Sequence, residues 1–302
     1  MALNIATFRK RLLTAVVFVA IMLLGLIGNQ WTFFILFTII HFGCWIEYQR
    51  ILDLVKPEYR EITAFHRYGV MIAGWCVLLY FTNDVFNIRD LSLHSVGFWL
   101  GLMFVFVLPL VELLLAKQVS GNSIGLSLGG LVYISLSLAL MIGLYEYHAP
   151  AKGIATGPNI PLALTLAIWI NDTMAYLVGS FIGKTPFSKI SPKKTWEGTL
   201  GGIILTILII GFAGSSQYSM ILGIPQDAAI NGNPIEHYHW FIIAALAGVA
   251  GTIGDLFESK LKRTANIKDS GHIMPGHGGF LDRFDSVLFA VPVVYVYVWL
   301  FM

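Results

Sequence analysis

The stretch GDLFESKLKRTANIKDSGHIMPGHGGFLDRFDS, residues 254–286, is a polar segment within an otherwise apolar chain. It contains four aspartates, five Lys or Arg residues and the run Pro-Gly-His-Gly-Gly. Charged side chains are costly inside a bilayer and, where they occur, face a protein interior or a water-filled cavity. The chain on either side therefore predicts membrane spans, and the stretch itself predicts a functional site.

The composition of the whole chain is that of an integral membrane protein. Of its 302 residues, 57% are hydrophobic and only 12% are charged, where soluble domains carry roughly 25% charged residues. This leaves little room for a separate soluble domain. The two cysteines, Cys44 and Cys76, lie in different apolar runs. We predict that both are packing residues rather than disulfide partners or metal ligands.

Nine apolar stretches approach or reach the roughly 17–25 residues needed to cross a bilayer. The first follows Arg9-Lys10-Arg11 but continues to about Gly28 without a small-residue cleavage site, so we expect a retained span rather than a signal peptide. The nine stretches are at about 12–28, 30–48, 68–82, 96–116, 125–144, 160–182, 199–216, 239–257 and 286–302.

The distribution of basic residues predicts the orientation of these spans, because Lys and Arg prefer cytoplasmic loops. With the N-terminus inside, all of the 19 Lys and Arg residues except Arg89 and Lys152 fall on the cytoplasmic side. We therefore predict an all-α, polytopic protein with about nine transmembrane helices, a cytoplasmic N-terminus and an outside C-terminus. Because nearly all intramembrane polarity lies after residue 159, we expect residues 1–158 to be a scaffold and residues 159–302 to be catalytic.

The aspartates of the polar stretch have helical spacing. Asp255, Ser259 and Lys262 share one face of a helix, and Asp282 and Asp285 share a face at the start of the last span. Three carboxylates brought together would repel one another unless cations lay between them. Hard oxygen ligands of this kind suit Mg²⁺, which also recruits substrate phosphates. The alternative is that these residues form interfacial salt bridges.

The run Pro275-Gly276-His277-Gly278-Gly279 lies between these two faces. Glycines let backbone amides approach an anion, and a following helix N-terminus favours negative charge. We expect the run to contact phosphate, with His277 as a phosphate contact or a loop brace. A re-entrant turn without a ligand is the alternative.

A second polar constellation begins in the sixth span. Asp172 and Tyr176, next to Asn171, are one helical turn apart, and the loop SPKKTWEG at 191–198 supplies Lys193 and Lys194. A lysine pair with neighbouring donors suits a triphosphate. The alternatives are a topology signal for the lysines and a helix-packing hydrogen bond for the aspartate.

Two glutamates lie in the N-terminal half. Glu47, at the end of the second span, is expected to be solvated at the cytoplasmic interface. Glu112, inside an apolar run, is expected to be an interhelical partner or a cavity residue.

The run SKLKRTANIKDSGHIMPGHGGFLDRFD, residues 259–285, resembles the signature of the CDP-diacylglycerol synthases, or phosphatidate cytidylyltransferases. The resemblance extends upstream through Gly254-Asp255, SPKKTWEG and the Asp172–Tyr176 segment, and so covers about residues 165–290. Met274 departs from the Leu, Ile or Phe usual in the family, an apolar exchange. The N-terminal half resembles the family only in being a run of spans.

The resemblance implies transfer of a cytidylyl group from CTP to phosphatidic acid, giving CDP-diacylglycerol and pyrophosphate. It implies Mg²⁺ with K⁺ as a companion, a homodimer, and a site at the cytoplasmic face of the cell (inner) membrane; no nucleic-acid partner is expected. The residues expected to be catalytic are Asp255, Asp282, Asp285, Lys262 and Arg263, of which the three aspartates bind metal. The residues expected to bind substrate are Ser259, Lys268, Asp269, His277, Gly278, Gly279, Arg283, Lys193, Lys194, Asp172 and Tyr176.

Three other functions share features with this one. A CTP-dependent polyprenol or lipid kinase would use the same nucleotide but transfer phosphate alone. A transporter of anionic solutes would also have buried aspartates, but it predicts inverted repeats that the sequence lacks. An intramembrane aspartyl protease needs a Gly-x-Gly-Asp motif, which fails because Thr252 occupies the first glycine position.

Overall fold

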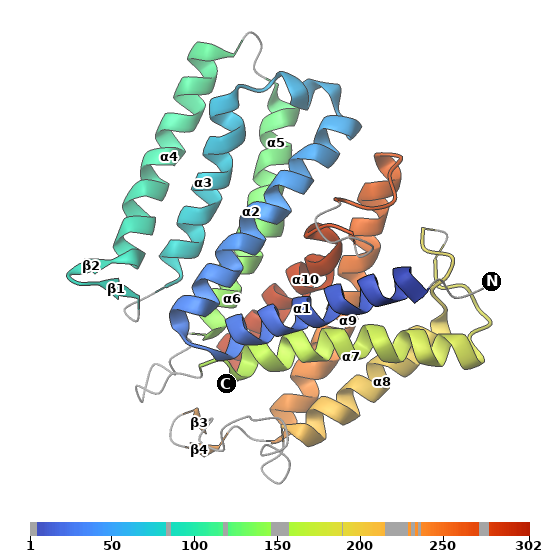
Figure 1. Ribbon diagram of the computed structural model, residues 1–302. Coiled ribbons are helices and arrows are strands. Elements are labelled where there is room, and N and C mark those ends of the chain that lie inside the picture. The colour runs from blue at the N-terminus through green and yellow to red at the C-terminus, as the bar shows by residue number, and fades with distance from the viewer. Residues whose placement is uncertain are drawn as a thin grey trace. The chain divides into compact units, whose positions relative to one another are not determined.

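The computed structural model describes residues 5–82, 86–116, 120–145, 157–188, 190–214, 229–230, 233–234, 237–271 and 278–302. Most of this part of the chain is helical (Figure 1). The helices are α1 (Ile5–Ile27), α2 (Gln30–Val55), the 3₁₀ helix η1 (Pro57–Glu61), α3 (Ala64–Tyr80), α4 (Leu93–Leu115), α5 (Gly121–Gly130), the π-helical segment η2 (Leu131–Leu136), α6 (Ser137–Tyr145), α7 (Asn159–Ile182), α8 (Trp196–Ala213), α9 (His237–Thr264) and α10 (Leu281–Phe301). Two short hairpins pair β1 (Asn87–Ile88) with β2 (Leu91–Ser92) and β3 (Ala229–Ile230) with β4 (Asn233–Pro234).

Each of the nine predicted spans coincides with helix. Within the described residues, seven helical stretches are long and apolar enough to cross a membrane. The other two are shorter: the apolar part of α1 is Leu13–Ile27, and α3 has 17 residues. The protein is therefore an all-α, multi-pass membrane protein.

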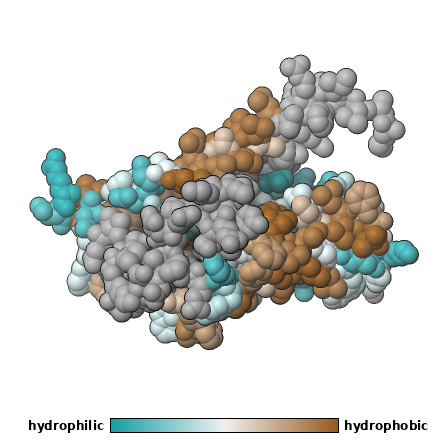
Figure 2. All heavy atoms as spheres, turned by 90° about the horizontal axis from the view of Figure 1, so that it is seen from below, coloured by the Kyte–Doolittle hydropathy of each residue, from teal (hydrophilic) through white to brown (hydrophobic). Residues whose placement is uncertain are grey.

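Hydrophobic side chains cover much of the surface seen in Figure 2. Apolar side chains of α4 are among those most exposed, since Phe106, Leu113 and Leu114 are each about 70% exposed. Exposed apolar surface on this scale marks contact with lipid or with another protein.

Short polar residues start several helices. Asn29 caps α2 by accepting hydrogen bonds from the backbone N–H groups of Trp31 and Thr32. Thr195 caps α8 by accepting from the N–H of Gly198. Such caps satisfy donors that the first turn of a helix leaves unpaired.

Two compact units make up the chain. The first contains Met1–Ala139 and Leu261–Phe284, and the second contains Leu140–Lys260 and Asp285–Met302. The sequence predicts a different division, into a scaffold up to residue 158 and a catalytic part after it. That division concerns function rather than compactness, and it stays a prediction.

In the first unit, α3 packs along α4 and against η2 (Figure 1). Its core contains the fully buried aromatic residues Phe33, Phe37, Trp45 and Tyr59. Both cysteines are buried, and neither forms a disulfide within the part of the chain that the structure describes. Their burial agrees with the packing role predicted for them.

In the second unit, α7 packs along α8, and α9 packs on α10. Gly198 and Gly202 of α8 lie directly against α7, where an added Cβ atom would meet Ala175. Gly254 of α9 similarly lies against the backbone of Asp285. Small residues let helix backbones approach closely, which is a common way for transmembrane helices to associate.

Candidate functional site

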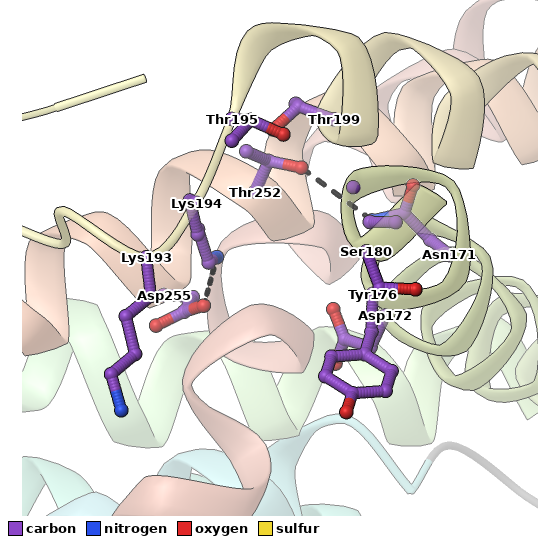
Figure 3. A pocket seen from close by; sticks show the side chains of 12 residues that line it. Asn171, Asp172, Tyr176, Ser180, Lys193, Lys194, Thr195, Thr199, Thr252 and Asp255 are labelled. Carbon is purple, nitrogen blue, oxygen red and sulfur yellow. Dashed lines mark hydrogen bonds and ion pairs between the residues drawn. The ribbon is translucent and has the colours of Figure 1, made fainter. Parts of the chain in front are cut away.

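A cavity of about 370 Å³ lies in the second unit among α7, the segment before α8, and α9 (Figure 3). Its walls bring together five residues predicted from sequence to act in the site. These are Asp172, Tyr176, Lys193, Lys194 and Asp255. Residues far apart in the chain thus meet at one cavity.

The carboxylate of Asp255 is held by two side chains. Lys194 Nζ donates to its Oδ2 atom, and Ser259 Oγ donates to its Oδ1 atom at 3.2 Å. The ion pair is partly open, with the Lys194 side chain 29% exposed and that of Asp255 28% exposed. Lys193 is exposed on the same wall. A cation pair and a carboxylate therefore face one accessible space.

The loop that carries the two lysines is tied to the start of α8. The Glu197 carboxylate accepts hydrogen bonds from the backbone N–H groups of Lys184 and Thr185, at 3.2 and 3.1 Å. The N–H of Phe187 donates to the carbonyl of Lys194 at 2.8 Å. These bonds fix the backbone from which the lysine side chains extend.

The lining of the cavity also contains a pair of polar side chains that are not assigned to the site from the sequence. Asn171 Nδ2 donates to Thr252 Oγ1 at 3.5 Å, and both residues are buried. Asn171 Oδ1 has no hydrogen-bond partner within the part of the chain that the structure describes. A buried amide oxygen of this kind is costly unless a ligand donates to it. The signal for Thr252 was a lone hydroxyl among small residues, three positions before Asp255.

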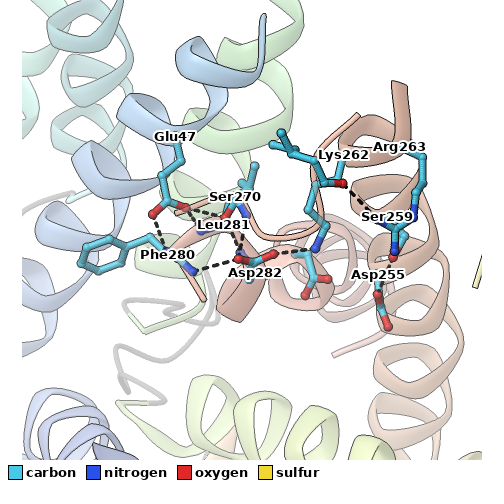
Figure 4. Close-up of polar contacts among 12 residues, drawn as sticks. Glu47, Asp255, Ser259, Lys262, Arg263, Ser270, Phe280, Leu281 and Asp282 are labelled. Atoms are coloured by element: carbon cyan, nitrogen blue, oxygen red, sulfur yellow. Dashed lines mark hydrogen bonds and ion pairs between the residues drawn. The ribbon is translucent and has the colours of Figure 1, made fainter. Parts of the chain in front are cut away.

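In the first unit, Asp282 occupies the first turn of α10 (Figure 4). Its Oδ1 atom accepts from Lys262 Nζ at 2.5 Å, and its Oδ2 atom accepts from the backbone N–H groups of Ser270 and Gly279, each at 2.8 Å. Gly278 has a φ of +85°, a conformation that L side chains rarely adopt. A Cβ atom at this position would also meet the Asp282 carboxylate.

Glu47 on α2 is part of the same network, so the expectation that it is solvated was wrong. Its side chain is buried, with the residue 3% exposed. It accepts hydrogen bonds from Ser270 Oγ and from the backbone N–H groups of Phe280 and Leu281. Hydropathy places Glu47 at the end of a span. It does not reveal the hydrogen-bond donors around its carboxylate, which belong to residues more than 200 positions later in the chain.

Glu112 on α4 is an interhelical hydrogen-bond partner, which is one of the two roles expected for it from the sequence. It accepts from Thr63 Oγ1, and its Oε1 atom lies 3.4 Å from His66 Nδ1. It also borders a largely apolar cavity of about 480 Å³ in the first unit.

The remaining predicted residues occupy different environments. Arg263 donates to the carbonyl of Ile267 at 3.0 Å. Asp285 is buried in the second unit, where its Oδ1 atom accepts from the N–H of Ser286. His277 lies outside the described residues. Arg263, Lys268, Asp269 and Arg283 are exposed.

The donor chemistry of the three aspartates fits a magnesium ion, because carboxylate oxygens are hard ligands. Asp255 and Asp285 belong to the second unit and Asp282 to the first. Over the ranges that the structure describes, no three His, Cys, Asp or Glu side chains form a group that could hold a metal ion. The magnesium site thus stays a prediction.

These features define a helical membrane protein with a lysine- and aspartate-lined cavity. The profile described as the Cytidylyltransferase family matches residues 9–301. The chain belongs to this family.

Three curated relatives named phosphatidate cytidylyltransferase are similar to the chain. The protein from Thermotoga maritima is 30% identical over 266 residues, covering 84% of this chain and 89% of the relative. The protein from Aquifex aeolicus is 35% identical over 219 residues, covering 71% and 72%. The protein from Bacillus subtilis is 39% identical over 137 residues, but this match spans only 45% of the chain and 46% of the relative.

Proposed function

We propose that this protein transfers a cytidylyl group from CTP to phosphatidic acid, giving CDP-diacylglycerol and pyrophosphate. The observation that carries the proposal is the cavity that places Lys193, Lys194 and Asp255 together in a chain of the cytidylyltransferase family. The names of its relatives supply the lipid substrate.

In this reaction a phosphate oxygen of phosphatidic acid attacks the α-phosphorus of CTP. The bond from that phosphorus to the bridging oxygen breaks, and pyrophosphate leaves. Both reactants are anions, so the protein must position them and neutralise their charge. No proton need be abstracted, because the attacking phosphate is already ionised.

The cavity residues suit these tasks. Lys193 is exposed on the cavity wall and is suited to the outer phosphates, and Lys194 reaches them by leaving Asp255. Asn171 Oδ1 accepts from a hydroxyl or amino group of the bound nucleotide, which satisfies its unpaired oxygen. Tyr176 and Asp172, both exposed toward the cavity, border the same nucleotide.

We further propose that Asp255, Asp282 and Asp285 hold Mg²⁺, with K⁺ as a companion. When bound, the metal supplies Lewis-acid neutralisation of phosphate charge. The lysines now paired with Asp255 and Asp282 would then be released toward the substrate phosphates.

The membrane arrangement that goes with this reaction has nine spans, a cytoplasmic N-terminus, an outside C-terminus and a homodimeric assembly in the cell membrane. CTP is cytosolic, so the site opens to the cytoplasmic face. Cysteine labelling from each side of the membrane tests this: a probe outside should reach Arg89→Cys and leave Lys268→Cys unlabelled. Light scattering in detergent tests the dimer.

The reaction is tested by incubating the purified protein with cytidine-labelled CTP and phosphatidic acid in detergent micelles, with and without Mg²⁺. We expect a labelled lipid, released pyrophosphate, and no product after chelation of the metal. Transfer of the γ-phosphate alone would show a lipid kinase instead. Intact CTP with every phosphatidic acid tried would overturn the proposal.

A further inference from the structure

We propose that Glu47 is a positioning residue for the proposed metal ligand Asp282: its buried carboxylate on α2 holds Ser270 and the start of α10. The link to turnover rests on the proposed function. The structural part stands on contacts within the first unit (Figure 4).

The Glu47 carboxylate accepts three hydrogen bonds, one from Ser270 and two from the start of α10. On one side it accepts from Ser270 Oγ at 2.6 Å. On the other it accepts from the N–H groups of Phe280 at 2.9 Å and Leu281 at 2.8 Å. A buried carboxylate is tolerated when hydrogen bonds of this kind replace its hydration. The same carboxylate thus joins Ser270 and the start of α10 to α2.

These bonds supply the N-terminal cap of α10 from another helix. The first N–H groups of a helix have no partner within it, and a negative charge there is favourable. At α10 the N–H groups of Phe280 and Leu281 are satisfied by Glu47, and the next one, of Asp282, donates to Ser270 Oγ at 3.2 Å. The start of α10 is therefore held by α2.

Ser270 couples Glu47 directly to Asp282. Its hydroxyl donates to Glu47 and accepts from the N–H of Asp282, while its own N–H donates to Asp282 Oδ2 at 2.8 Å. A shift of Glu47 thus moves Ser270, and Ser270 contacts Asp282 through both its backbone and its side chain.

Glycines make room for this arrangement. A Cβ atom at Gly271 or Gly279 would overlap the Glu47 carboxylate. Gly43, one helical turn before Glu47 on α2, lies against the ring of Phe280, and a Cβ atom there would overlap that ring. One face of α2 therefore accommodates both the side chain and the backbone N–H of Phe280.

The test compares Glu47→Gln with a matched control, Glu112→Gln. Both changes remove the charge of a buried glutamate in the first unit. Glu112 contacts Thr63 and His66 and is not part of the proposed site. Hydrogen exchange is measured by mass spectrometry on the full-length protein in detergent, on peptides that cover residues 278–284. Turnover and the Mg²⁺ concentration for half-maximal activity are measured on the same samples.

We expect Glu47→Gln to raise amide exchange at residues 280–281 at least tenfold, to lower kcat at least tenfold, and to raise the half-maximal Mg²⁺ concentration several-fold. We expect Glu112→Gln to leave all three within twofold of wild type. A merely structural role would reduce the yield of folded protein without changing the Mg²⁺ requirement of the folded fraction. That outcome, or unchanged exchange at residues 280–281, would overturn the proposal.

Ser270→Ala provides a second variant if Glu47→Gln does not fold, because it keeps the Glu47 carboxylate and its bonds to Phe280 and Leu281 but removes the hydroxyl that joins Glu47 to the N–H of Asp282. It should raise exchange at residue 282 and lower kcat, and wild-type values for both would contradict the coupling. If the wild-type protein makes no CDP-diacylglycerol, the proposed function fails. The exchange measurements would still decide whether Glu47 holds the start of α10.

Discussion

Two lysine–aspartate pairs, one in each unit, differ in how their carboxylates are held. Asp282 is 9% exposed, and besides Lys262 it accepts from two backbone N–H groups. Asp255 is 28% exposed, and the hydrogen bonds described for it come from the side chains of Lys194 and Ser259. A backbone N–H group is fixed in place by the fold of its segment. A side chain, in contrast, can change its hydrogen-bond partner by rotation about its single bonds. Asp282 is thus placed before substrate arrives, and Asp255 can exchange Lys194 for another cation.

The largest expected effects are those of replacing Asp282 or Asp255. The two replacements should reduce activity equally but differ in how much they reduce the stability of the fold. Asp282→Asn and Asp255→Asn should each lower kcat by about 10³-fold, on the scale seen when one electrostatic contact to a transition state is removed. Asp282→Asn should also lower the free energy of unfolding by about 3 kcal/mol, because it removes one charge of an ion pair whose two side chains are only 12% and 9% exposed. Asp255→Asn should cost less than about 1 kcal/mol, since the pair is partly exposed. Activity assays and thermal unfolding in detergent measure both quantities; equal losses of stability would remove the distinction.

Replacing Lys262, the partner of Asp282, should reduce stability more than replacing Lys194, the partner of Asp255. Lys194→Met should raise the KM for CTP about 10- to 100-fold, the equivalent of about 1.5–3 kcal/mol for a charge-assisted contact, and leave unfolding nearly unchanged. Lys262→Met should lower the unfolding temperature, because the Asp282 carboxylate loses its buried cation. Steady-state kinetics with varied CTP and parallel melting curves measure these effects. A melting change in Lys194→Met as large as that in Lys262→Met would contradict the comparison.

The backbone beside Asp282 should be intolerant of side chains. Gly278→Ala should lower the free energy of unfolding by about 1–3 kcal/mol, because it forces a left-handed conformation on alanine. It should also lower turnover, because the new Cβ atom would meet the Asp282 carboxylate. Gly121→Ala is the control, since nothing lies within 4 Å of a Cβ atom at that position. Similar melting curves for the two variants would show that the turn is free to rearrange.

The smallest effect is expected at the hydroxyl that orients Asp255. Ser259→Ala removes one hydrogen bond worth about 1 kcal/mol, so kcat should fall about fivefold. Thr173→Val serves as the control, because the exposed Thr173 hydroxyl donates to the carbonyl of Trp169 on its own helix. If turnover fell 100-fold in Ser259→Ala, the serine would have to contact substrate directly.

Much of the second unit was predictable from helical spacing and loop chemistry. The sixth span with Asp172 and Tyr176, and the loop with Lys193 and Lys194, were predicted as one substrate site, and the structure brings them to one cavity. Asp255 was predicted as a metal ligand, and its pairing with Lys194 was not foreseen. Thr252 was considered only as a mismatch to a protease motif, although it donates to the helix and contacts Asn171.

The first unit was less predictable at the residue level. Glu47 was expected to be solvated, because a carboxylate at the end of a span normally reaches water. Its partners Ser270, Phe280 and Leu281 lie more than 200 residues later in the chain. A local pattern carries no information about contacts at that separation.

The sequence by itself determined the helical membrane class, the family resemblance and the residues that carry charge in the C-terminal half. This is possible because the apolar composition of a segment alone decides whether it can cross a bilayer. In addition, the spacing of residues along a helix decides which of them share a face. Only the tertiary structure decided that Lys194 pairs with Asp255, that Lys262 pairs with Asp282, and that Glu47 caps α10. Those choices depend on which helix surfaces meet, and a buried carboxylate takes the donors that packing places beside it.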